Sequence, residues 1–387
     1  MRRIDLVVSN DRHHAAMAVP VVQALRARGG FSPRVLSLCE LRGLTTPEGL
    51  LREAGAEVVR LVPSGLRRSP SSGGGEATAG PSRRTRALRR LVWSLLLRPH
   101  LARAWRERPA VTVVPNDFAF PYDRLADALR KRRLPFLLLQ EGIRFPLPAE
   151  RGPRRYGSGG ADVIAVWGES SRRHFAALGV PTERIHVTGN PRLAPLPAPV
   201  AERRGRGRAL LLATNPIDDQ GYCTRAEKLA LVARFVAALE GALARRELTL
   251  ALKLHARESA DEYRTAMGPL SALVEVETDT PLTALLESHD AAVVLASSVG
   301  VEALRAGLGL GVLEIPGHGF AWEYVASGAA EGLAWDAAPM PEQVERLFDR
   351  RAERRPAAEA FLRDVLAPVA DPTGRIVDLI ETLSHAD

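Results

Sequence analysis

Short apolar runs alternate with helix-like segments through the first half of the chain. Residues 15–28 have apolar positions every three residues, as on one face of a helix, and Gly29 and Gly30 end this segment. Two further helices are predicted at residues 46–54 and 124–133. The apolar runs have strand length and comprise residues 4–8, 34–38, 57–62, 111–114, 136–139, 163–166 and 185–187.

The alternation stops at residue 193 and restarts at residue 209. Residues 193–200 contain three prolines, and a charged, glycine-rich run follows, which is typical of a solvated linker. Beyond this linker the predicted elements are strands at 209–213, 248–254, 273–276, 291–295 and 311–315, and helices at 225–245, 282–288 and 299–306.

Continuous apolar strands joined by helices indicate an α/β fold with parallel sheets covered on both faces. We therefore expect two Rossmann-like, doubly wound domains, residues 1–192 and 209–366, joined by the linker 193–208. Residues 367–387 are expected to form a C-terminal helix that packs back on the first domain. Because ligands of open α/β sheets bind beyond the carboxyl ends of the strands, two facing sheets place a ligand in the cleft between them.

The composition excludes several classes of protein. The chain has 387 residues, 46% of them apolar, which is enough for a sizeable core and excludes wholesale disorder. No stretch approaches the roughly 20 uncharged apolar residues of a membrane span, and the N-terminus has a strand pattern rather than that of a signal peptide. Cys39 and Cys223 lie far apart and form neither a disulfide framework nor a metal cluster. A bacterial cytoplasm is the expected location.

The net charge of +8 is carried almost wholly by arginine, since only three of the 53 basic residues are lysine. This bias suits a GC-rich genome, and the scarce aromatic residues form no nucleic-acid motif with the arginines. We therefore expect no nucleic-acid partner, whereas an anionic small molecule or a membrane surface remains open as a partner.

Polar residues follow the first strand, where the predicted cleft lies. His13 and His14 could donate to an acceptor molecule or to a leaving phosphate. Alternatively, the neighbouring Asn10 or Asp11 simply caps the helix that begins here.

Two more strand ends carry acids. Asp117 follows residues 111–114 and is either a general base or an ordinary loop acid. Glu141 and Arg144 follow residues 136–139 and supply a carboxylate and a guanidinium able to hold an anion with two parallel hydrogen bonds. A structural ion pair between Glu141 and Arg144 is the alternative.

Strand ends later in the chain carry hydrogen-bond donors. Gly189 would let backbone N–H groups approach a phosphate, and His255 ends a buried strand as either a ligand contact or a core histidine. Ser297 and Ser298 open a predicted helix and could bind an anion or merely cap it. Glu302, about one turn on, could accept the hydroxyls of a ribose. The candidate nucleotide contacts are Gly189, Asn190, Thr214, Asn215, His255, Ser297, Ser298 and Glu302.

A basic amphipathic segment, residues 83–108, does not fit the alternation. It mixes arginines with leucines and two tryptophans and is predicted to form one helix, or two separated at Pro99. It could pack on the sheet with a solvated basic face, or it could be a membrane-surface or acceptor-docking element. A Ser/Gly-rich stretch, residues 69–80, precedes it and is predicted to be mobile.

Taken together, these segments resemble the GT-B superfamily, specifically the branch with non-hydrolysing UDP-N-acetylglucosamine 2-epimerases and capsule or wall-polymer glycosyltransferases. The similarity is spread over roughly residues 1–335. Val187-Thr-Gly-Asn-Pro191 matches the segment before the family's interdomain linker, and residues 17–25 are similar to the epimerases' first helix.

The resemblance extends to candidate site residues. Gln140-Glu-Gly-Ile-Arg144 resembles the epimerases' His-Val-Glu-Ala-Gly-Leu-Arg segment, which implies a catalytic carboxylate at Glu141. Asn116-Asp117 resembles their Gly-Asp pair, and residues 297–302 resemble their nucleotide-binding segment. The family implies a nucleoside diphosphate in the cleft, UDP first and CDP or CMP as alternatives, with no separate cofactor. Nothing in the sequence indicates a metal site.

Two departures from the epimerase pattern count against an epimerase, while Lys253-Leu-His255 and the segment 297–304 resemble transferases that use nucleotide donors. Where the epimerases carry His-Arg-x-Glu-Asn, this chain has Thr214-Asn-Pro-Ile-Asp-Asp219, and the epimerases' paired glycines are Ser298 and Val299 here. We therefore expect a nucleotide-sugar-dependent glycosyltransferase acting on an unknown sugar, lipid or small-molecule acceptor. An epimerase-like isomerase and a non-catalytic binding relative are the alternatives, and a homodimer and a peripheral contact of residues 83–108 with the inner membrane face remain open.

In this expectation each part of the cleft has one task. Asp117 or Glu141 deprotonates the acceptor, and Glu302 holds the ribose of the donor. The leaving diphosphate is stabilised by Arg144, His255, Ser297 and Ser298.

Overall fold

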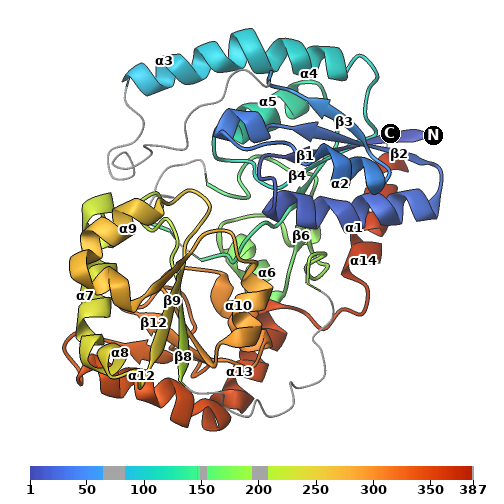
Figure 1. The fold of residues 1–387 in the computed structure, drawn as a ribbon. Coiled ribbons are helices and arrows are strands. Elements are labelled where there is room, and N and C mark those ends of the chain that lie inside the picture. The colour runs from blue at the N-terminus through green and yellow to red at the C-terminus, as the bar shows by residue number, and fades with distance from the viewer. Residues whose placement is uncertain (64–82, 146, 149–154, 194–207, 386–387) are drawn as a thin grey trace.

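The computed structural model describes residues 1–63, 83–145, 147–148, 155–193 and 208–385. Most of the predicted linker and the Ser/Gly-rich stretch lie outside these residues. Two α/β domains lie one below the other in Figure 1, and each is built on a parallel sheet. The predicted fold class, two Rossmann-like domains, is confirmed.

The first domain holds a seven-stranded sheet in the order β3-β2-β1-β4-β5-β6-β7. Its buried strands are short runs of Val, Leu and Ile, residues that fit a sheet covered on both faces. The strands are β1 (Arg2–Val8), β2 (Phe31–Ser37), β3 (Glu57–Arg60), β4 (Val111–Val114), β5 (Phe136–Leu139), β6 (Val163–Val166) and β7 (Ile185–Val187).

Helices cover both faces of this sheet. They are α1 (His13–Arg28), η1 (Cys39–Arg42), α2 (Glu48–Glu53), α3 (Arg83–Leu91), η2 (Val92–Leu97, a π-helical turn), α4 (Arg98–Ala104), α5 (Tyr122–Lys131), α6 (Glu169–Ala177) and η3 (Thr182–Arg184).

The second domain holds a six-stranded sheet in the order β10-β9-β8-β11-β12-β13. Its strands are β8 (Ala209–Ala213), β9 (Thr249–Lys253), β10 (Glu275–Glu277), β11 (Ala291–Val294), β12 (Gly309–Leu313) and β13 (Glu331–Leu333). Its helices are α7 (Arg225–Ala238), α8 (Glu240–Ala244), α9 (Ala260–Met267), η4 (Gly268–Leu273), α10 (Leu282–Ser288), α11 (Val299–Arg305), α12 (Met340–Asp349) and α13 (Arg351–Val365).

Two predicted helices are divided. The helix predicted over 225–245 turns at Leu239, which is fully buried and lies two residues before Gly241, a weak helix former. The basic segment widens into the turn η2 just before Pro99, which lies in the first turn of α4. Proline has no N–H to donate, so the turn that precedes it cannot close with regular α-helical bonds.

The chain crosses between the domains twice. Asp364 at the end of α13 pairs with Arg173 of α6, and the backbone there packs on Gly168, where a side chain would not fit. The last helix, α14 (Pro372–His385), then lies against α1, with Ile376 and Ile380 fully buried in the core of the first domain. Among the described residues, no helix is long and apolar enough to cross a membrane.

Candidate functional site

The carboxyl ends of β1, β4 and β5 lie side by side, because these strands are neighbours in the first sheet. The chain leaves β1 through a turn in which Asn10 Oδ1 accepts hydrogen bonds from the N–H groups of Arg12 (3.0 Å) and His13 (2.7 Å). Asn10 thus supports the start of α1, as one of the two sequence interpretations predicted. The turn places His13 and His14 at the edge of the sheet.

The Glu141 carboxylate is held by both neighbouring strand ends. His14 Nε2 lies 2.7 Å from Oε2, and Asn116 Nδ2 donates to Oε1 at 2.7 Å. The Ser9 N–H donates to His14 Nδ1 at 3.1 Å, so Nε2 of His14 carries a proton that points at Glu141. Glu141 is therefore an oriented carboxylate rather than a loose surface acid.

His13 reaches the same residue through the backbone. Its Nε2 contacts the Glu141 carbonyl oxygen, which can only accept a hydrogen bond. The proton therefore lies on Nε2, and Nδ1 keeps its lone pair. Burial, followed by the charge of Arg192, lowers the pKa of His13 to about 4, so the ring is neutral near pH 7.

Burial by itself raises the pKa of Glu141, but the hydrogen bond and charge of His14 and the hydrogen bond from Asn116 lower it to about 2. At neutral pH the cluster thus holds an anionic carboxylate on Glu141, with the neutral imidazole of His13 near it. This combination can orient and deprotonate a hydroxyl group.

Asp117 lies beside the cluster but turns away from it. Its two carboxylate oxygens accept the N–H groups of Gly157 (2.8 Å) and Gly159 (2.6 Å), and burial raises its pKa. A side chain at Gly159 would collide with the Asp117 carboxylate, which shows how closely this loop is packed. The contacts favour the loop-acid interpretation, and Asn116 rather than Asp117 contacts Glu141.

Arg144 lies where β5 meets the interdomain cleft. Its guanidinium carbon is 4.1 Å from the centre of the Tyr156 ring, and its Nε donates to the Ile143 carbonyl at 2.9 Å. The Tyr156 hydroxyl donates to the Pro115 carbonyl at 2.8 Å, which ties Arg144 to the loop after β4. Arg144 thus presents its charge from a fixed platform three residues after Glu141.

A cleft of about 800 Å³ opens between the domains next to Arg144. The Phe145 and Trp322 rings stack across it with centres 6.2 Å apart. Burial and then the charge of Arg144 lower the pKa of His174 in its wall to about 4. Both domains contribute to its lining, among others Arg144, Phe145, His174, Tyr222, His318 and Trp322.

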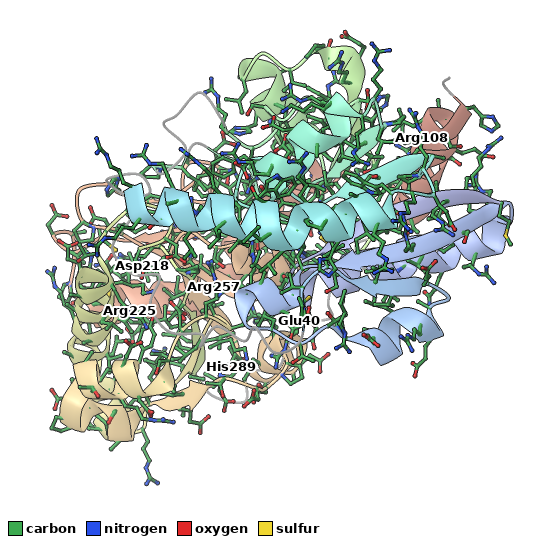
Figure 2. The ribbon with its side chains drawn as sticks, turned by 90° about the horizontal axis from the view of Figure 1, so that it is seen from above. Glu40, Arg108, Asp218, Arg225, Arg257 and His289 are labelled. Atoms are coloured by element: carbon green, nitrogen blue, oxygen red, sulfur yellow. The ribbon has the colours of Figure 1, made fainter. Side chains whose placement is uncertain are left out.

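Two of the predicted residues of the second domain, Thr214 and His255, meet at the ends of β8 and β9. Glu258 accepts hydrogen bonds from the Thr214 hydroxyl (2.5 Å) and the His255 N–H (2.9 Å). Lys228, buried in α7, joins Glu258 (2.9 Å) to Asp218 (2.7 Å). In Figure 2, Asp218 lies lower on the page than α3, near the labelled Arg225. This buried ionic network fixes the loops that carry Thr214 and His255.

His255 has a defined tautomer. Its Nδ1 accepts the Arg257 N–H at 3.2 Å, so in the neutral ring the proton is on Nε2. Burial, then Arg257, lowers its pKa to about 4. His255 therefore offers a neutral N–H donor at a strand end. Asn215 instead links two strand ends, because its Nδ2 donates to the Ala296 carbonyl at 2.8 Å.

Ser297 and Ser298 precede the short helix α11. The Ser297 hydroxyl accepts the Val299 N–H at 3.2 Å, and its carbonyl accepts the Tyr324 hydroxyl at 2.9 Å. A side chain at Gly300 would overlap the Tyr324 ring, so this glycine serves packing. Ser297 has the local hydrogen bond of an ordinary cap, while no such bond occupies the Ser298 side chain.

Glu302 faces the first domain. Arg192 donates to its carboxylate at 2.9 Å from Nη2 and 3.4 Å from Nη1. The charge of Arg192 also lowers the pKa of His13, so the same arginine acts on both His13 and Glu302. Arg192 was not among the predicted site residues, although it directly follows the Val-Thr-Gly-Asn-Pro segment. Lys228 and Glu258 were missed as well, and the position of Glu258 three residues after His255 was the only sequence signal.

Gly189 and Asn190 lie at the crossover between the domains. The Gly189 N–H donates to the Val166 carbonyl at 3.2 Å, and a Cβ on Gly189 would lie 3.0 Å from Pro372. Its positive φ of 80° is a further reason for glycine here. Asn190 accepts the Arg192 N–H at 2.9 Å. These contacts favour a packing role over the predicted approach to a phosphate.

Among the described residues, no group of three or more His, Cys, Asp or Glu side chains could hold a metal ion. A scan against protein-family models and a search of curated proteins find no match.

Solved structures do match, over nearly the whole chain. A co-structure of S. aureus MnaA with UDP has 13% identity and a TM-score of 0.62, covering 99% of this chain and 96% of that one. The UDP-GlcNAc 2-epimerase of Methanocaldococcus jannaschii, in complex with UDP-GlcNAc and UDP, has 12% identity and a TM-score of 0.56, covering 98% and 99%. The glycosyltransferase SnogD from Streptomyces nogalater has 22% identity and a TM-score of 0.53, covering 99% and 100%.

At these identities the comparisons show the fold. The chain has the GT-B fold, two Rossmann-like domains across a cleft, and it resembles both UDP-GlcNAc 2-epimerases and GT-B glycosyltransferases.

Proposed function

We propose that this protein is a glycosyltransferase that moves a sugar from a nucleotide donor to an acceptor hydroxyl. The observation that carries the proposal is the Glu141 carboxylate, which His14 and Asn116 hold at the end of the first sheet. It lies three residues before Arg144, which lines the interdomain cleft.

On the acceptor side, Glu141 is the general base. Its pKa of about 2 keeps it ionised at neutral pH. Such a weak base accepts a proton readily only when the acceptor oxygen has begun to bond to the sugar carbon, because that oxygen becomes strongly acidic as the bond forms. His14 and Asn116 position the carboxylate, and His13, through Nδ1, can accept a hydrogen bond from the acceptor.

On the donor side, Glu302 binds the ribose hydroxyls, and Arg144, His255 and Ser298 stabilise the leaving diphosphate. The Nε2–H of His255 and the guanidinium of Arg144 supply donors without a metal ion. Support for a uridine nucleotide comes from the UDP and UDP-GlcNAc in the S. aureus and M. jannaschii structures. UDP is therefore the first donor nucleotide to test, before CDP and CMP.

Arg192 connects the two halves of this scheme. In the structure it pairs with Glu302, the same carboxylate that we assign to the ribose. Ribose hydroxyls would compete for Glu302, and the displaced guanidinium would lie near the diphosphate. Donor binding and the assembly of the anion site are thus coupled through one side chain.

The test is donor turnover without an acceptor, using UDP-, dTDP-, CDP- and GDP-sugars. The proposal predicts slow release of the nucleotide from one donor and its strong reduction in the Glu141→Gln variant. Exposed Glu287 on α10 offers a matched control, Glu287→Gln, which should keep the wild-type rate. Equal nucleotide release by the Glu141→Gln variant would contradict the role of Glu141.

An epimerase-like isomerase is the second candidate, and TM-scores of 0.61 and 0.56 with two structures described as UDP-N-acetylglucosamine 2-epimerases, against 0.53 with SnogD, favour it. Inverting a C–H centre requires proton removal on one face and proton return on the other, hence two groups. In the second domain, the acids Asp218 and Glu258 both form ion pairs with Lys228, which argues against either of them as the second proton-transfer group. Appearance of the C2 epimer from donor alone would select the isomerase.

A binding protein that keeps the fold without catalysis is the remaining alternative. A ligand at 100 times its dissociation constant stabilises its protein by about 2.7 kcal/mol. Failure of every nucleotide to raise the melting temperature would support this alternative over both enzymes.

A further inference from the structure

The basic segment α3–η2–α4 divides into a packed half and an exposed half. Leu97, Leu101 and Trp105 are buried in the core of the first domain and hold the C-terminal half in place. In contrast, α3 has no buried residue over its whole length. Figure 1 shows α3 along the top of the molecule, with its N-terminal end reaching out above α9, and Figure 2 shows it on the face seen from above.

Three leucines form an apolar stripe on this exposed half. Leu88, Leu91 and Leu95 are 40%, 55% and 64% exposed, and their spacing of three and four residues places them on one helix face. Among the described residues, the only other exposed large apolar side chains are those of Met1 and Leu50. An apolar stripe that the fold leaves in water suggests a surface used for contact.

The charge around this stripe has a single sign. Residues 83–106 contain eight arginines and no Asp or Glu. Arg84 and Arg98 continue the leucine stripe at its two ends, because they lie four residues before Leu88 and three after Leu95. Such a face attracts a polyanionic surface.

We propose that α3 and η2 bind the surface of an anionic phospholipid bilayer. A helix lying in the bilayer interface can insert its leucines among the acyl chains while its arginines reach the phosphates. A nucleic acid or an acidic protein segment would satisfy the arginines but offers no apolar layer to the three leucines. The stripe therefore selects lipid over the other polyanions.

This inference is independent of the proposed transfer reaction. It places the bilayer against the first domain, which carries the Glu141 cluster. An acceptor held at the membrane surface would then approach the first domain, as the proposed division of the cleft requires.

The experiment is co-sedimentation of the full chain with vesicles of phosphatidylglycerol and phosphatidylcholine, compared with vesicles of phosphatidylcholine alone. The inference predicts binding to the anionic vesicles that weakens at least tenfold when salt rises from 0.1 to 0.5 M. It also predicts at least a tenfold weaker association for the variant Leu88→Ser, Leu91→Ser, Leu95→Ser, and for Arg84→Gln, Arg90→Gln.

Matched controls lie elsewhere on the surface. Leu50→Ser changes a leucine that is 48% exposed on α2, and Arg246→Gln with Arg363→Gln removes two exposed charges far from α3 in the sequence. These controls should bind vesicles as the wild type does. Because α3 buries no residue and Leu95 of η2 is 64% exposed, the leucine variant should keep its melting temperature and its response to nucleotides, so a failed enzyme proposal stays distinguishable.

Two outcomes overturn the inference. One is equal or absent binding to anionic and neutral vesicles. The other is undiminished vesicle binding by the leucine variant together with loss in the arginine variant, which would identify a general polyanion surface instead of a bilayer contact.

Discussion

Glu141 shows how single side chains define the proposed chemistry. A carboxylate that accepts two directed hydrogen bonds keeps one orientation, and its low pKa follows from those bonds despite burial. His14 and Asn116 each come from a different strand end, so the orientation depends on the sheet and not on the local sequence. Glu302 is oriented in a comparable way by Arg192.

Replacing Glu141 with glutamine should lower the turnover number about 10²- to 10⁴-fold, the usual contribution of a general base. Nucleotide affinity should change little, because the residue lies on the acceptor side. Single-turnover kinetics and calorimetry on the same preparation measure the two effects. A variant that loses nucleotide binding and keeps its turnover number would refute the assignment.

Replacing Glu302 with alanine should weaken nucleotide binding by about ten- to hundredfold, since hydrogen bonds to a charged group contribute roughly 1.5–3 kcal/mol. Titration calorimetry with UDP gives the value, and Glu287→Gln serves as the exposed control. Unchanged UDP affinity in a folded Glu302→Ala variant would remove this residue from the site.

At the scale of elements, parallel strands explain why chemistry gathers at two sheet edges. Residues that follow neighbouring strands meet in space even when over a hundred positions separate them, as His14 and Glu141 do. In the second domain the loops after β8 and β9 are joined by the buried network of Lys228, Asp218 and Glu258. The same network holds Thr214 and the backbone of His255 through Glu258.

Lys228→Met should destabilise the protein by about 3–5 kcal/mol, because it leaves two buried carboxylates without their cation. Urea unfolding measures the change. Lys131→Met, at an exposed lysine that ends α5, is the matched control and should alter stability by less than about 0.5 kcal/mol. Equal effects of the two substitutions would contradict the structural role of the network.

The sequence predicts helices and strands well where the apolar pattern is strong. It predicts contacts between distant residues only indirectly, from which strands are expected to be neighbours in a sheet. The strands at 111–114, 136–139 and 163–166 are confirmed residue by residue, because each is a continuous apolar run. The break at Leu239 and the π-helical turn before Pro99 depend on packing and on backbone hydrogen bonds. The spacing of apolar residues carries no information about either.

The same limit applies to the site. Their position after predicted strands was enough to identify Glu141 and His14 as candidate site residues. It could not show that Gly157 and Gly159, some forty residues later, occupy the Asp117 carboxylate. Nor could it pair Arg192 with Glu302, which lie 110 positions apart. Roles that depend on long-range partners therefore required the structure.

At the scale of the molecule, the chain connects the two domains a second time, beyond the crossover at residue 193. The chain returns after α13, and α14 completes the core of the first domain beside α1. The cleft between the domains is lined from both sides, with His174 from the first domain and His318 from the second. A ligand in this cleft would therefore contact both domains.

Stability should fall as the pH decreases from 6.5 to 5. The pKa values of His13, His174 and His255 are lowered to about 4, so in this range the unfolded chain binds more protons than the folded one. Each histidine can contribute up to about 1.4 kcal/mol per pH unit. Urea unfolding between pH 7.5 and 5 measures the slope, and His174→Gln should reduce it. A flat profile would contradict these pKa values.

The most direct test of the account is a thermal-shift screen with UDP, CDP, CMP, GDP, dTDP and ADP on the wild type and on Glu302→Ala. The account predicts a rise in melting temperature with one uridine or cytidine nucleotide, and a much smaller rise in the variant at the same concentration. No shift with any nucleotide, or an equal shift in both proteins, would contradict the claim that this cleft binds a nucleotide-sugar donor through Glu302.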